Sequence, residues 1–151
     1  MMGSPAVAQD CTLDQSFYQQ QAQALAASRP GALYEAETGF VHWSMPDLGR
    51  VSVRIGGCQH FGLEAVSERS ASQPSSPEQA IAIARYLVLS AWPAPNDSQV
   101  AIALAGTVDI TQTEDGSVVY RYPMPGVEAL TLEQTFAAGI ETLRVRVIFP
   151  T

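Results

Sequence analysis

The spacing of apolar residues predicts an amphipathic helix near the start of the chain. Between residues 12 and 31 the apolar side chains gather on one side and glutamines fill the other, which is typical of a helix that lies on a sheet. Thr12 and Gln15 have the spacing of a capping box, so they predict the start of this helix. Arg29-Pro30-Gly31 predicts its end.

A second helix is predicted after the Ser-, Pro- and Gln-rich loop 70–76. Ser76 is the expected N-cap, Pro77 the first helical residue, and Gln79 the residue that closes a capping box. The body, Ala80–Trp92, is apolar on most sides, so we expect it either to be covered on both sides or to leave an apolar patch. Pro93-Ala94-Pro95 predicts its end.

Elsewhere the apolar residues alternate with polar ones, which is the period of a strand. In Arg50–Ile55 the aliphatic side chains share one face, and Arg50, Ser52 and Arg54 share the other. Asp115-Gly116 predicts a hairpin turn. The expected strands are Leu33–Thr38, Phe40–Met45, Arg50–Ile55, His60–Ser67, 100–104, Val108–Thr113, Ser117–Tyr122, 130–136 and 143–149, with a helix at 131–138 as an alternative.

These elements predict a single α+β domain over residues 9–151, with a mainly antiparallel sheet of six to eight strands and two helices. Residues 1–8 are expected to be a cloning scar and a signal-peptide remnant, because Ala6-Val7-Ala8 has the small-x-small pattern of a cleavage site. The longest nearly apolar run, Ala80–Trp92, is shorter than the about 20 residues that span a membrane.

Charge and cysteine content narrow the function classes. The net charge is −7, and all 8 basic residues are arginines without a basic run, which disfavours binding to nucleic acid or anionic membranes. Cys11 and Cys58 are compatible with one disulfide in an oxidising compartment, here the periplasm; two buried free thiols in a cytosolic protein are the alternative. A bridge closing a loop of about 48 residues would stabilise the fold by about 4 kcal/mol.

Candidate catalytic chemistry is sparse. Cys58 and His60 could form a thiolate–imidazolium pair, but on a straight strand they lie about 7 Å apart. The alternative is a half-cystine at a strand end, with Gly56-Gly57 forming a bulge or tight turn. The chain has only 2 histidines, His42 and His60, and no paired Cys-x-x-Cys, nucleophile elbow or phosphate loop, so we expect no metal, no cofactor and no enzyme.

Binding is the remaining class, because aromatic and arginine side chains beside stiff turns are typical anchors for a partner protein. The alternative is that the prolines merely end a helix and a strand. If these loops do not dock, the apolar helix Ala80–Trp92 is the next candidate surface. The candidate partner-binding residues are Trp92, Asn96, Asp97, Ser98, Glu114, Asp115, Tyr120, Arg121 and Tyr122.

The chain resembles the small periplasmic proteins with which Gram-negative bacteria block cell-wall hydrolases. It is similar to them in its size, trimmed signal, two cysteines, acidic charge and α+β content. These are lysozyme inhibitors and the immunity proteins paired with type VI secretion effectors. The most similar segment is Val53–Gly62, while the Ser-Gly-x-x-Tyr element of one lysozyme-inhibitor group is missing. The resemblance implies a loop that enters the active-site cleft of a secreted amidase or muramidase, and the acidic charge suits a basic hydrolase.

The sequence thus predicts a periplasmic immunity or inhibitor protein with no catalytic residues. The alternative, from another class, is a small periplasmic enzyme or ligand-binding domain that uses a cleft near Cys58, His60 and His42.

Overall fold

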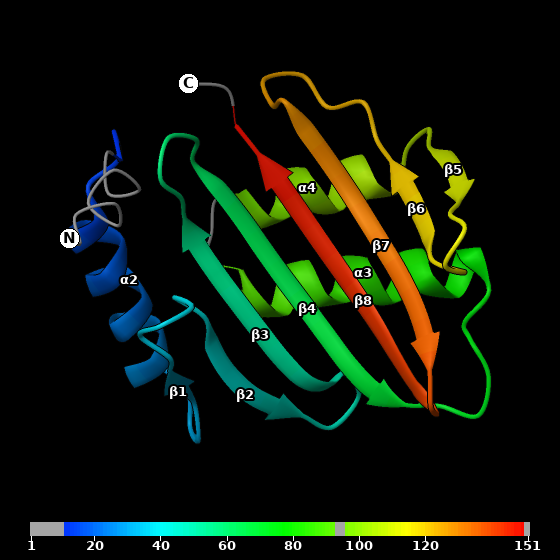
Figure 1. Cartoon of the computed structure of the whole chain (residues 1–151), viewed down its shortest axis with the longest axis horizontal. Coiled ribbons are helices and arrows are strands. Elements are labelled where there is room, and N and C mark those ends of the chain that lie inside the picture. The colour runs from blue at the N-terminus through cyan, green and yellow to red at the C-terminus, as the bar shows by residue number, and fades with distance from the viewer. Residues whose placement is uncertain (1–10, 93–95, 150–151) are drawn as a thin grey trace, which may run out of the picture.

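Eight strands form one antiparallel sheet, accompanied by three helices, in the residues that the computed structural model describes, 11–92 and 96–149 (Figure 1). The α+β fold class is therefore confirmed, with one helix more than the two expected. Residues 1–8, the expected scar and signal remnant, lie outside the described residues, as do residues 93–95.

The order of strands divides the chain into two similar halves. Each half is helical first and then forms a meander of four strands, and the last strands of the two meanders, β4 and β8, pair in the order β1-β2-β3-β4-β8-β7-β6-β5. The helices are α2 (Gln15–Ala27), α3 (Pro77–Ala91) and α4 (Asn96–Leu104). The strands are β1 (Leu33–Tyr34), β2 (Val41–Met45), β3 (Gly49–Gly56), β4 (Gly62–Ser70), β5 (Asp109–Gln112), β6 (Val118–Arg121), β7 (Ala129–Ala137) and β8 (Ile140–Ile148).

Helix α4 replaces a predicted strand. The alternation at residues 100–104 indicated a strand, but Val100, Ala101 and Leu104 are buried at the spacing of a helix while Ile102 is 72% exposed. The alanines between the larger side chains fit both periods and have the highest helix propensity of all residues. The prediction of a strand at 100–104 was therefore wrong.

The start of α2 also differs from the prediction. The N-cap is Asp14 rather than Thr12, and its carboxylate accepts a hydrogen bond from the N–H of Phe17 at 3.2 Å. The N–H of Leu13 donates to the carbonyl oxygen of Cys58 at 3.0 Å, and this bond holds residues 11–13 against the β3–β4 loop. Because this segment is tied to the loop, the helix begins two residues later than the capping box predicted.

Helix α3 begins as predicted. The N–H of Gln79 donates to the Ser76 hydroxyl at 3.3 Å, and the N–H of Ser76 donates to the Gln79 side-chain oxygen at 3.0 Å. The inner face of α3 is buried against the sheet and α4, whereas Tyr86 and Leu89 are 45% and 50% exposed. Part of the expected apolar patch therefore remains on the outer side of the helix.

The hydrophobic core lies on one face of the sheet. Alternate residues of the central strands point to this face, among them Val53 on β3, Leu63 on β4 and Val145 on β8. Helices α3 and α4 lie behind the sheet in Figure 1, and α2 adds Ala22 to the same core. No helix in Figure 1 lies on the opposite face, so the other half of the strand residues faces outward.

Candidate functional site

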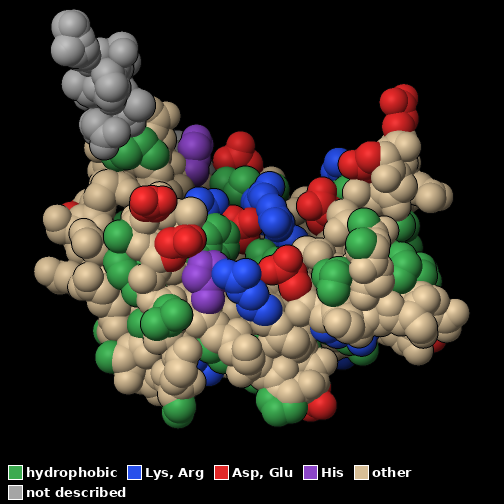
Figure 2. All heavy atoms as spheres, turned by 60° about the horizontal axis from the view of Figure 1, so that its bottom comes forward, with side chains coloured by type: hydrophobic (Ala, Val, Ile, Leu, Met, Phe, Trp, Pro, Cys, Tyr) green, Lys and Arg blue, Asp and Glu red, His purple; other side chains and the backbone are tan. Residues whose placement is uncertain are grey.

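The uncovered face of the sheet carries most of the arginines of a protein whose net charge is −7. Strand alternation places 5 of the 8 arginines on this face. They are Arg50, Arg54, Arg121, Arg144 and Arg146, and the acidic residues on the same face of the strands are Glu64, Glu68, Asp109 and Glu133. Figure 2 shows arginine, acidic and histidine side chains gathered around a hollow in the molecule. We call this surface the uncovered face.

Glu64 is the centre of the cluster and is only 5% exposed. Arg54 donates to one of its oxygens at 2.8 Å, and Arg146 donates to the other at 3.3 Å. The Nε of Arg144 lies 3.4 Å from the same oxygen as Arg146 without forming a hydrogen bond. Because three guanidinium groups surround one carboxylate, the cluster has an excess of positive charge.

The cluster opens into a pocket of about 230 Å³ where β3 ends and β4 begins. Arg54, Arg146, Glu64 and His60 line it, together with Gly56, Gly57 and Gly62 and a short part of β8. His60 reaches it from the β3–β4 loop, and its Nδ1 lies 3.7 Å from a carboxylate oxygen of Glu128. The pocket therefore combines cationic side chains with exposed backbone.

A disulfide joins Cys11 to Cys58 in this loop, with their Cα atoms 4.5 Å apart, as the sequence predicted. The backbone is closely packed at the Gly pair: a Cβ at Gly57 would stand 2.0 Å from the carbonyl oxygen of His60. Gln15 donates from α2 to the carbonyl oxygen of Gly57 at 2.7 Å. Since the sulfur of Cys58 is bonded to Cys11, Cys58 has no thiolate to act as a nucleophile in this state.

His42 lies on the uncovered face between a serine and a carboxylate. Its Nδ1 is 2.7 Å from the Ser52 hydroxyl, and its Nε2 is 3.3 Å from Glu35. Hydrogen bonds from Thr38, first, and from His42 lower the pKa of Glu35. His42 and Ser52 lie on β2 and β3, next to the edge strand β1, and the backbone N–H groups of the ladders around them are paired, so they cannot stabilise an oxyanion. The arrangement orders the sheet edge rather than forming an acyl-transfer site.

The three residues of the alternative site, Cys58, His60 and His42, line three pockets, of which the first two share part of their lining. Cys58 lines a pocket of about 550 Å³ between α2 and β3, His60 lines the pocket beside Glu64, and His42 lines a third pocket of about 560 Å³ beside β1 and β2. Within the described residues no group of three or more His, Cys, Asp and Glu residues is placed to hold a metal ion.

The tip of the β5–β6 hairpin, one of the predicted docking loops, is closed by several hydrogen bonds. The N–H of Thr113 donates to the carbonyl of Ser117 at 2.8 Å, and Gly116 takes a φ of 89°, which favours glycine. One carboxylate oxygen of Asp115 accepts from the Thr113 hydroxyl and, at 3.1 Å, from the N–H of Ser117. The bond from Thr113, followed by those from Ser117, lowers the pKa of Asp115. Glu114 and Asp115 are both exposed on this tip.

The predicted partner-binding residues therefore separate into three groups. Trp92, Tyr120 and Tyr122 are 2%, 0% and 5% exposed, so the prediction that they anchor a partner is corrected: their rings belong to the core. Burial raises the pKa of Tyr122 to about 12. The side chains of Asn96, Asp97 and Ser98 lie outside the described residues. Glu114, Asp115 and Arg121 are exposed and belong to one hairpin.

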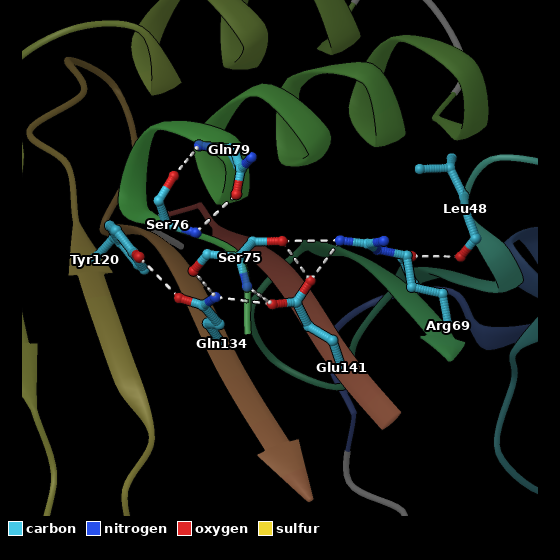
Figure 3. Close-up of polar contacts among 9 residues, drawn as sticks. Leu48, Arg69, Ser75, Ser76, Gln79, Tyr120, Gln134 and Glu141 are labelled. Atoms are coloured by element: carbon cyan, nitrogen blue, oxygen red, sulfur yellow. Dashed lines mark hydrogen bonds and ion pairs between the residues drawn. The ribbon is translucent and has the colours of Figure 1, made fainter. Parts of the chain in front are cut away.

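A second polar cluster lies beneath the N-terminus of α3, and Figure 3 shows its contacts. The Glu141 carboxylate is fully buried and accepts from Ser75, from Gln134 at 2.9 Å and from Arg69 at 2.7 Å. Gln134 in turn accepts from the Tyr120 hydroxyl at 2.9 Å. Together these contacts join the loop before α3 and the strands β4, β6, β7 and β8, so the cluster stabilises the fold.

The sequence did not predict the Glu64 cluster. Its signal was the pair of arginines, Arg144 and Arg146, that face away from the core on β8, but the sequence alone does not show that Glu64 lies opposite them.

Comparisons with protein families, curated proteins and solved structures found no match to this chain. In the described part of the chain, no helix is long and apolar enough to cross a membrane.

Proposed function

We propose that this protein is an exported immunity or inhibitor protein that blocks a secreted cell-wall hydrolase, an amidase or a muramidase, in the periplasm, and that it is not an enzyme. The observation that carries the proposal is the ordered acidic tip of the β5–β6 hairpin, Thr113–Ser117.

The tip is suited to enter a cleft because its conformation is already fixed. Backbone bonds close the turn, and Asp115 holds it from the side, so little conformational entropy is lost on docking. Glu114 and Asp115 then present two carboxylates to a partner. In the basic cleft of a hydrolase these groups would accept hydrogen bonds from catalytic or substrate-binding donors.

Charge and compartment add support. A chain of net charge −7 is attracted to a basic hydrolase, and opposite potentials accelerate encounter. The Cys11–Cys58 bridge is typical of proteins in oxidising compartments such as the periplasm.

The experiment is a binding measurement with purified peptidoglycan amidases and muramidases, including a basic c-type lysozyme. The test variant combines Glu114→Gln with Asp115→Asn, because an amide at the second position keeps the acceptor oxygen of the turn and removes only the charge. Loss of central anchors should weaken binding about 30-fold or more. The matched control, Glu37→Gln with Asp47→Asn, removes two charges from other turns and should bind as the wild type does.

Two results would argue against the proposal. Either no hydrolase of the two classes binds the wild type, or the hairpin variant and the control bind a hydrolase equally well.

A further inference from the structure

The pocket where β3 ends and β4 begins has the features of an anion site. Its two arginines come from strands far apart in the sequence, yet the register places Arg54 and Arg146 on either side of Glu64. Both guanidinium groups line the same pocket of about 230 Å³, with His60 beside them. This volume is smaller than the about 300–1,000 Å³ of typical drug-sized sites, so it suits a small group.

The charge of the cluster favours a further anion. Glu64 supplies one negative charge against those of Arg54, Arg144 and Arg146, which all approach it within 3.4 Å. Like charges this close repel one another. A second anion in the pocket would reduce that repulsion, because Glu64 and Glu133, which lies opposite Arg144 on β7, still leave one of the three positive charges uncompensated.

The arginines also have donors to spare. A guanidinium has about five N–H donors in a planar fork, and the bonds to Glu64 use the Nη2 group of Arg54 and of Arg146. The ring of Phe40 stacks on Arg54 at 5.0 Å and keeps its side chain in place. Because the wall opposite is formed partly by glycines, a ligand can approach the backbone closely.

We propose that this pocket binds a small oxyanion group, a carboxylate or a phosphate, with Arg54 and Arg146 as its main hydrogen-bond donors and His60 lining the site. Planar, bidentate contacts of this kind are the usual way in which arginine binds both groups. The site is separate from the β5–β6 hairpin, so it does not depend on the function proposed above.

The test is a nuclear magnetic resonance titration of the full ¹⁵N-labelled chain with sodium phosphate and, separately, sodium acetate, at constant ionic strength. Saturable shifts are expected in the backbone amide signals of Gly57 and Gly62, which line the pocket. The anion that saturates at the lower concentration identifies the preferred group. Shifts that saturate with neither anion in the millimolar range would overturn the proposal.

Three variants separate a specific site from general attraction. Arg146→Gln should weaken binding about tenfold or more, since bonds to charged groups are the stronger ones. Arg50→Gln, on the same face but outside the pocket, should leave binding unchanged. Glu64→Gln should tighten binding several-fold, because it removes the competing carboxylate.

The Glu64→Gln variant tests the proposal independently if an arginine variant fails to fold. If Glu64→Gln binds phosphate and acetate no more tightly than the wild type, or if Arg50→Gln weakens binding as much as Arg146→Gln, the pocket is not the site. Variants of the β5–β6 hairpin should leave the titration unchanged, so failure here and failure of hydrolase binding are distinguishable.

Discussion

The Glu141→Gln substitution should destabilise the protein strongly, although it changes one group and almost no volume. Each carboxylate oxygen of Glu141 accepts two hydrogen bonds: Oε1 from Arg69 at 2.7 Å and the Ser75 hydroxyl at 2.7 Å, and Oε2 from the Ser75 N–H at 2.6 Å and Gln134 at 2.9 Å. In glutamine one of these two oxygens is replaced by an amide NH₂ group, which is a hydrogen-bond donor. Whichever oxygen is replaced, the two groups that donated to it lose their acceptor and face another donor.

The magnitude follows from that geometry. Two bonds to a charged acceptor are lost, at about 1.5–3 kcal/mol each, and the charge of Arg69 is left without its partner. Breaking a buried ion pair by removing one member typically costs about 3–5 kcal/mol, so we expect a loss in this range. That is a large part of the about 5–15 kcal/mol that stabilises a typical domain.

The pH dependence gives a second readout. Burial by itself would raise the pKa of Glu141, but the hydrogen bonds from Ser75 and Gln134 and the charge of Arg69 outweigh it, and the net shift is downward from 4.5. The ionised form is therefore favoured in the folded state. Its contribution is present above about pH 4.5 and is lost as the pH falls through the lowered pKa. Glu141→Gln should lack this part of the acid sensitivity.

The assay is urea unfolding at pH 7 and at a series of lower pH values, followed by circular dichroism. The matched control is Glu68→Gln, since Glu68 lies on the uncovered face of β4 and should change stability by less than about 0.5 kcal/mol. Equal stability of Glu141→Gln and Glu68→Gln at pH 7 would show that the buried contacts of Glu141 do not stabilise the fold.

Three further variants test other contacts of the fold. Cys11→Ser with Cys58→Ser should lower the free energy of unfolding by about 4 kcal/mol, measured by urea unfolding; a loss below about 1 kcal/mol would contradict the role of the bridge. Arg29→Lys should lower the free energy of unfolding by about 1–2 kcal/mol, because the guanidinium of Arg29 stacks on Trp43 at 4.6 Å and caps the end of α3. An unchanged urea midpoint would contradict this, since it would show that any positive charge at this position stabilises the fold equally well. Gly57→Ala should destabilise the β3–β4 loop by about 1–3 kcal/mol, since the new methyl group would clash with a carbonyl oxygen 2.0 Å away, and a thermal midpoint equal to the wild type's would contradict this.

Local signals explain what the sequence could predict. The capping box of Ser76 and Gln79 and the turn at Asp115-Gly116 depend on neighbouring residues only, and both are present in the structure. Where a signal was ambiguous, tertiary contacts decided. At residues 100–104 the alternation fitted a strand, but packing against α3 selected a helix.

The candidate site depends on contacts that the sequence does not encode locally. Alternation places Tyr120 and Tyr122 on one face of β6 and Arg121 on the other, but it does not show which face meets the core. Likewise, Glu64 meets Arg146 only because β4 pairs with β8 at one register across 82 residues. A shift of one residue would have placed these charges in the core.

The most direct test of the proposed function is the clearing of a peptidoglycan suspension by a purified amidase or muramidase that binds the protein. We expect clearing to stop when the protein reaches an equimolar ratio to the hydrolase, and we expect the variant combining Glu114→Gln with Asp115→Asn to require a large excess. Undiminished clearing with the wild-type protein in molar excess over every such hydrolase would contradict the proposed function.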